Sequence, residues 1–95
     1  MGLEQVELVM DAEDEFGISI DSVHDYGQSV ATVGAFYDLV LRLVRERPHS
    51  KFAHRPDLES HVWNQVATLA AKHGYGVKPP NITRETRFIE DLGYG

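Results

Sequence analysis

Histidine, serine and acidic side chains are the residues of this chain that could do chemistry, and their spacing decides what chemistry is open to them. His49, His54, His61 and His73 lack the close pairing of a HExxH or zinc-knuckle site, and the chain has no cysteine to supply a thiolate. The sequence also contains no Ser-His-Asp order, nucleotide-binding loop or phosphate-cradling glycine pattern. We therefore expect neither a metal site nor enzymatic activity.

Acidic residues near the N-terminus form the most regular charged pattern. At helical spacing they make one stripe, which consists of Glu4, Glu7, Asp11 and Asp14. An apolar shoulder lies beside it and consists of Leu3, Val6 and Met10. Charge runs are commonly only a solvated helix face. Carboxylates beside apolar side chains also suit docking, because charge steers a basic partner and burial holds it.

The distribution of charge along the chain favours a protein partner. The formal net charge is −6, and residues 1–41 contain no Lys or Arg. Such a half repels nucleic acid and attracts basic protein surfaces. The sign then reverses over a short stretch with Arg42, Arg45, Arg47, Lys51 and Arg55. These cations either complement a helix C-terminus or form a basic binding patch.

Length and composition indicate one small domain. The chain has 95 residues, of which 42% are hydrophobic, and this is enough for a single core. No apolar run is long enough to span a membrane, and the N-terminus lacks the basic-then-apolar pattern of a signal peptide. The absence of cysteine fits a reducing interior. We expect a soluble, cytoplasmic protein that binds no membrane.

Three helices are predicted from hydrophobic periodicity and capping residues. The first covers 3–16 and ends at Gly17, the second runs from a Thr32 cap to Pro48, and the third covers 58–73 after an Asp57 cap. The expected core residues of the first helix are Leu8, Val9, Ala12 and Phe16. Those of the second are Val33, Phe36, Tyr37, Val40, Leu41 and Val44, and those of the third are Leu58, Val62, Val66, Leu69 and Ala70.

The remaining segments read as loops. Residues 22–26 form at most one short helix, capped by Asp21 or Ser22, and 47–56 form a polar linker. In 77–95, Pro79 and Pro80 exclude helix, while Ile82 and Phe88 supply apolar pegs for the core, whose edge Trp63 covers. No strand pattern competes, so the predicted class is all-α.

Two segments resemble the acyl carrier protein family. "LEQVELVMDAEDEFGISI" resembles the family's second helix, and "TVGAFYDLV" resembles the start of its last helix. The C-terminal "ITRETRFIEDLG", with the amphipathic helix before it, resembles the family's first helix and the long loop that leads to its prosthetic-group serine.

The family's order is rotated in this chain. Read in a circle, "FIEDLGYG" runs into "MGLEQVELVM" and rebuilds the passage that surrounds the family's attachment site. The resemblance implies one carrier-like three- or four-helix bundle in permuted order. Residues 1–46 then match the family's second to last helices, 47–56 are a linker, and 57–95 match the first helix and long loop.

The attachment serine is missing from this match. Family members carry 4'-phosphopantetheine on the serine of Asp-Ser-Leu; Leu3 matches that leucine and places Gly2, or Met1, at the serine. Glycine has no hydroxyl, so we expect no prosthetic group there. Ser22, in "DSV", is a weaker alternative site, because it follows the helix that should come after the attachment serine.

Three hypotheses follow from this resemblance. In the first, the chain is a carrier-like module without its own serine and docks on basic surfaces of fatty-acid or polyketide enzymes that use acyl carriers. It would bind through Glu4, Val6, Glu7, Met10, Asp11 and Asp14. In the second, it is a true carrier modified at another hydroxyl or completed by a serine of another chain. In the third, two copies exchange the helix 58–73 and form a homodimer.

Overall fold

The computed structural model describes residues 4–20, 30–47, 50 and 52–94. These residues form three α-helices, α1 (Glu4–Phe16), α2 (Val33–Glu46) and α3 (Leu58–His73), and a short 3-10 helix, η2 (Pro79–Asn81). Across these ranges there is no strand, only an isolated antiparallel bridge between Thr32 and Arg87. The predicted all-helical class is confirmed.

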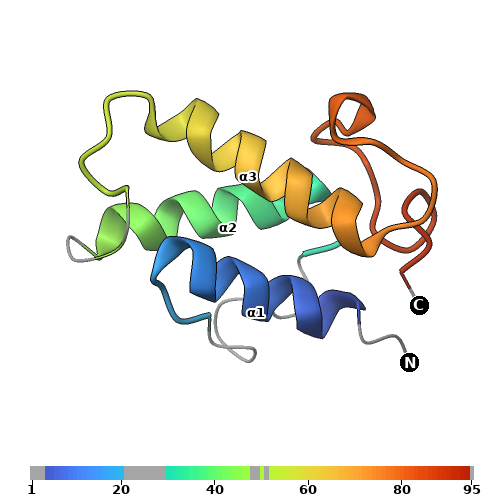
Figure 1. The fold of residues 1–95 in the computed structure, drawn as a ribbon, viewed down its shortest axis with the longest axis horizontal. Coiled ribbons are helices and arrows are strands. Elements are labelled where there is room, and N and C mark those ends of the chain that lie inside the picture. Colours follow the sequence, from blue (N-terminus) through green and yellow to red (C-terminus); the bar gives the residue numbers. More distant parts are fainter. Residues whose placement is uncertain (1–3, 21–29, 48–49, 51, 95) are drawn as a thin grey trace.

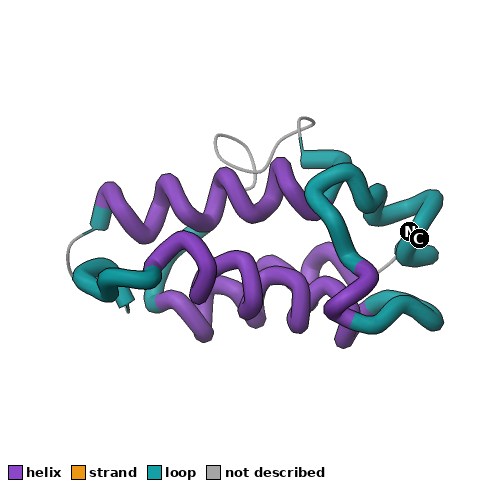
Figure 2. Tube along the Cα trace, turned by 90° about the horizontal axis from the view of Figure 1, so that it is seen from above, coloured by secondary structure: helices purple, strands orange, loops and turns teal. Residues whose placement is uncertain are grey.

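The helix α3 lies against both of the other long helices and joins them into one bundle. It runs opposite in direction to α1 and α2, as Figure 1 shows. The first turns of α1 and α2, the last turn of α3 and the segment 82–94 therefore gather at one end of the molecule (Figures 1 and 2). Residues far apart in the sequence meet at this end.

The first helix is positioned by one apolar face and by its C-terminal turn. Leu8, Ala12 and Phe16 are completely buried, as their spacing predicts. Gly17 adopts a left-handed φ of 63°, and the amide of Ile18 donates to the carbonyl of Glu13. This is a Schellman turn, so the predicted stop at Gly17 is confirmed.

The second helix is capped by residues from both near and distant parts of the chain. The Thr32 hydroxyl accepts a hydrogen bond from the amide of Ala35, as predicted. The amide of Gly34 donates to the carbonyl of Arg84 at 3.0 Å. A Cβ at position 34 would lie 2.7 Å from that carbonyl oxygen, so glycine permits this close approach. The C-terminal segment is thus locked onto the start of α2.

The third helix begins where predicted, but its cap differs. Asp57 precedes Leu58, yet its carboxylate makes no hydrogen bond to the helix and instead pairs with Arg55. The predicted capping role of Asp57 is therefore wrong, because a bidentate bond to a nearby guanidinium satisfies the same oxygens. At the other end, a Cβ on Gly74 would lie 3.3 Å from Leu92.

The connector between α2 and α3 is packed and is not simply a polar tether. Ser50 is buried, and its hydroxyl donates to the carbonyl of Val44 at 2.9 Å. The ring of Phe52 packs edge-on against Phe16 and lies 4.4 Å from His61, centroid to centroid. The predicted polar linker over 47–56 thus also contributes packed side chains at these positions.

The C-terminal segment supplies more core residues than its sequence pattern predicts. Ile82 and Phe88 are buried as predicted, and Leu92 and Tyr94 are buried as well. The prediction that Pro79 and Pro80 exclude helix is wrong for a 3-10 helix, since these two residues begin η2. Proline suits a first helical turn because its φ is already close to the helical value.

Several predicted features lie outside the described residues. They are the short helix at 22–26 with Asp21 and Ser22, the ends Met1, Gly2, Leu3 and Gly95, and the side chains of His49 and Lys51.

Candidate functional site

The six predicted docking residues all lie on α1, and the structure divides them into two sets. Glu4 and Asp11 contact the last turn of α3 and the segment after it, whereas Val6, Met10 and Asp14 are exposed to solvent. Glu7 lies at the border of the two sets, because its side chain is 58% exposed and its carboxylate also lies 3.9 Å from the imidazole of His73.

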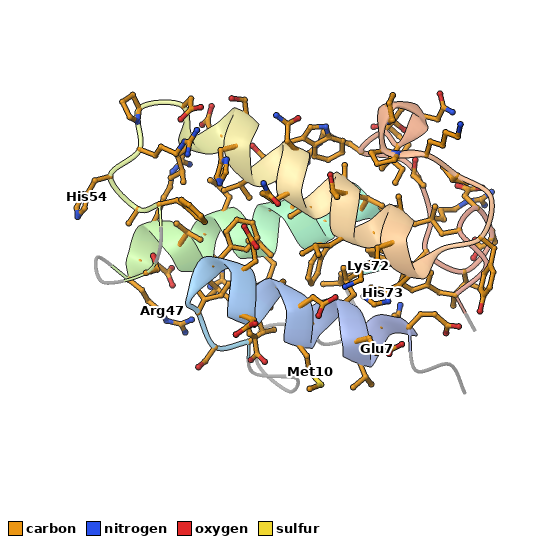
Figure 3. All side chains as sticks on the ribbon, in the orientation of Figure 1. Glu7, Met10, Arg47, His54, Lys72 and His73 are labelled. Carbon is orange, nitrogen blue, oxygen red and sulfur yellow. The ribbon has the colours of Figure 1, made fainter. Side chains whose placement is uncertain are left out.

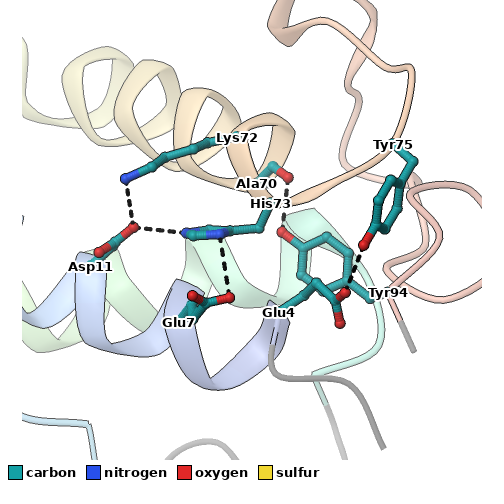
Figure 4. Close-up of polar contacts among 8 residues, drawn as sticks. All are labelled: Glu4, Glu7, Asp11, Ala70, Lys72, His73, Tyr75 and Tyr94. Carbon is teal, nitrogen blue, oxygen red and sulfur yellow. Dashed lines mark hydrogen bonds and ion pairs between the residues drawn. The ribbon is translucent and has the colours of Figure 1, made fainter.

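Asp11 is the centre of the contact between α1 and α3 (Figure 4). Its Oδ2 lies 2.7 Å from Nε2 of His73 and 3.2 Å from Nζ of Lys72. The hydrogen bond from His73 is the main reason that the pKa of Asp11 lies below its usual value, and partial burial opposes this shift. Glu7 extends the cluster, because its Oε1 lies 3.9 Å from Nδ1 of the same imidazole.

Tyr75 brings the two ends of the described chain together. Its hydroxyl donates to the carboxylate of Glu4 at 3.0 Å, and its amide donates to the carbonyl of Leu92, also at 3.0 Å. The bond to Glu4 raises the pKa of the phenol. Beside it, the hydroxyl of Tyr94 donates to the carbonyl of Ala70 at 2.8 Å (Figure 4). The start of α1 and the end of the described chain therefore meet at one place.

The opposite side of α1 carries apolar side chains in water. Val6 is 54% exposed and Met10 is 61% exposed, and Met10 points away from the bundle (Figure 3). Met10 also lines a shallow, open hollow with neighbouring acidic residues. We call the set Val6, Glu7, Met10 and Asp14 the α1 outer face.

The turn after α1 fixes the outer face in place. The carboxylate of Glu13, which borders the same hollow, accepts a hydrogen bond from the amide of Ile20 at 2.8 Å. The guanidinium of Arg47 donates to the carbonyl of Ser19 at 2.6 Å. A rigid helix with a fixed end loses little conformational freedom when a partner covers it.

The basic stretch does not form an open patch in the part of the chain that the structure describes. Arg45 pairs with Glu59 at 2.6 Å, and Arg42 lies 3.8 Å from Glu46. Arg55 pairs with Asp57. These internal pairs favour the interpretation that the cations serve the end of α2 and the connector, where Arg45 occupies the last helical turn.

The sequence did not predict the residues that contact the acidic stripe from α3 and the segment after it, namely Lys72, His73 and Tyr75. The last turn of a predicted helix is a usual place for Lys and His, so the only signal pointed to the helix dipole. The packing of α3 on α1 redirects them to Glu4, Glu7 and Asp11. Within the described ranges, no group of three or more His, Asp or Glu residues could hold a metal ion.

Comparison with known proteins adds no identification. No protein-family model matches the chain, and no match was found among curated proteins or among solved structures. Within the described residues, no helix is both long and apolar enough to cross a membrane.

Proposed function

We propose that the chain is a protein-docking module that binds a basic, partly apolar surface through the α1 outer face. The observation that carries this proposal is the exposure of Val6 and Met10, side by side on one helix, next to the carboxylates of Glu7 and Asp14. Apolar side chains held in water on a rigid helix gain free energy when a partner covers them. The carboxylates around them select a partner of opposite charge.

The finer proposal is that this module is an acyl-carrier-like bundle in permuted order. It is supported by the resemblance of the two terminal segments to consecutive parts of one carrier motif. It is also supported by the contacts of Tyr75, which join Glu4 to Leu92 and so bring those segments together. The partners would then be enzymes of fatty-acid or polyketide synthesis that dock on acyl carriers, in the cytoplasm.

The proposal includes the loss of carrier chemistry, because Gly2 matches the position of the attachment serine. The alternative is a true carrier that is modified at Ser22 or at another hydroxyl. Intact-mass measurement after incubation with a phosphopantetheinyl transferase and coenzyme A separates the two. An unchanged mass agrees with our proposal, and the gain of one phosphopantetheine arm contradicts it.

Docking is tested by measuring the affinity of the chain for a purified phosphopantetheinyl transferase and a β-ketoacyl synthase from the same organism. Met10→Ala should weaken binding by about 1–2 kcal/mol, because it removes a central apolar anchor. The matched control is Ile89→Ala, since Ile89 is similarly exposed, at 63%, and is followed by Glu90 and Asp91. Binding that both substitutions weaken equally, or that neither changes, would contradict a docking role for α1.

The charged part of the proposal is tested with Asp14→Asn rather than with Asp11. Asp11 contacts α3, so its removal would change stability as well as charge. Asp14→Asn should lower the association rate and weaken its dependence on salt. Glu90→Gln makes the same charge change on the C-terminal segment and should leave both quantities unchanged.

A further inference from the structure

The contact between Lys72 and Asp11 bears on how the α1 outer face is regulated. We propose that Lys72 is a built-in competitor of the basic partner: in the free protein its ammonium occupies Asp11, and it must give up or share that carboxylate when a partner docks. This inference rests on the proposed docking function. It predicts that the native chain binds its partner less tightly than its carboxylates would otherwise allow.

The geometry separates Lys72 from its neighbour His73, although both contact the same oxygen. Nζ of Lys72 lies 3.2 Å from Oδ2 of Asp11, and the lysine side chain is 61% exposed. The imidazole of His73 lies 2.7 Å from that oxygen and is only 12% exposed. His73 is therefore a packed part of the α1–α3 contact, whereas Lys72 reaches the carboxylate from the solvent side.

The exposure of Lys72 makes its contact easy to break. An exposed lysine–carboxylate pair contributes little to stability, because water screens the charges and a long side chain must be ordered. Releasing Lys72 therefore leaves the packed His73 contact and the fold in place. A partner's arginine or lysine could then take the position at Asp11 that the ammonium of Lys72 now holds.

The position of Asp11 connects this competition to the docking face. Asp11 lies next to Met10 in the sequence and lines the same shallow hollow as Met10 and Asp14. A cation that approaches the α1 outer face is therefore repelled by the ammonium of Lys72. It is also attracted less strongly by Asp11, whose negative charge Lys72 already neutralises. Both effects lower the affinity for a basic partner.

The test compares Lys72→Gln with Lys78→Gln, which removes the same charge from an exposed lysine that forms no ion pair with a described residue. The probe is a synthetic helical peptide of about 18 residues with a leucine stripe flanked by arginines, long enough to be partly helical alone. Its dissociation constant is measured by following the Met10 methyl resonance. Lys72→Gln should bind about two- to fivefold more tightly than Lys78→Gln.

Each outcome decides one of the two proposals. If the peptide shifts the Met10 methyl resonance but the two variants bind equally, or Lys72→Gln binds more weakly, the competition is refuted and the docking face stands. If the peptide leaves the Met10 resonance unchanged in every variant, the docking face is refuted and the inference falls with it. Unfolding in urea must give similar midpoints for both variants, which excludes a change of fold as the cause.

Discussion

The hydroxyl of Tyr94 offers a sharp test of how the C-terminal segment is held. Tyr94 is 2% exposed, and its hydroxyl donates to the carbonyl of Ala70 in the last turn of α3. In a regular helix that carbonyl would accept from the amide of Gly74, but this amide donates to Ala71 instead. Tyr94→Phe therefore removes the partner of a carbonyl in a buried contact while keeping the ring and its packing.

The loss of unfolding free energy in Tyr94→Phe follows from the burial of the Ala70 carbonyl in this contact. Leaving a buried acceptor unsatisfied costs about 1–3 kcal/mol, and we expect about 1.5 kcal/mol here. For a chain of this size, that lowers the midpoint of thermal unfolding by about 6–12 °C. Calorimetry and urea unfolding of Tyr94→Phe measure both quantities.

The matched control is Tyr75→Phe, which removes an exposed hydroxyl that donates to Glu4. Water replaces this bond, so we expect the control to unfold at the same midpoint as the native chain. A Tyr94→Phe variant as stable as the native chain, or a control that loses as much, would refute the packing of the C-terminal segment against α3.

Two further predictions concern the carboxylates and the helix caps. The hydrogen bond from His73 lowers the pKa of Asp11 in the folded chain. The ionised carboxylate of Asp11 therefore stabilises the fold fully above the ordinary Asp pKa of about 3.9, and this stabilisation is lost as the pH falls through the lower folded-state pKa. Asp11→Asn should thus be less stable than the native chain at pH 6, and the gap in urea midpoint should close toward about pH 2; a constant gap would contradict the contact. Thr32→Ala should cost about 1 kcal/mol, because it deletes a cap that the structure shows. Asp57→Ala should cost less, since Asp57 makes no cap bond, and equal losses in chemical denaturation would refute this difference.

Local patterns in the sequence were sufficient to predict the positions of the three long helices. Leu8, Ala12 and Phe16 recur at helical spacing, Gly17 can adopt the left-handed turn, and Thr32 can cap α2 without help from distant residues. Each of these features depends on neighbours within one or two turns, so the predicted ends of the helices lie within a residue or two of the observed ends.

Most contacts between residues far apart were not predicted, although Ile82 and Phe88 were expected to enter the core and are buried. The approach of Arg84 to Gly34 and the burial of Tyr94 on Ala70 depend on how the C-terminal segment returns to the bundle. No local spacing encodes that path. Asp57 shows the same limit on a smaller scale, because a good capping residue was diverted by Arg55.

The sequence predicted which residues form the candidate site, but not which of them contact α3 and which remain exposed. The spacing placed the carboxylates and the apolar shoulder on one helix, and Val6 and Met10 are indeed exposed there. The sequence pattern does not reveal that Lys72 and His73 reach back across the bundle to Asp11. The proposed docking face is consequently narrower than the full acidic stripe.

The docking proposal is tested most directly by recording the methyl NMR spectrum of the chain while the purified phosphopantetheinyl transferase or β-ketoacyl synthase is added. We predict that the Met10 resonance shifts and saturates while the resonances of Ile89, equally exposed to solvent on the C-terminal segment, stay in place. Shifts confined to Ile89, or a spectrum unchanged by both enzymes, would contradict the claim that α1 carries the binding surface.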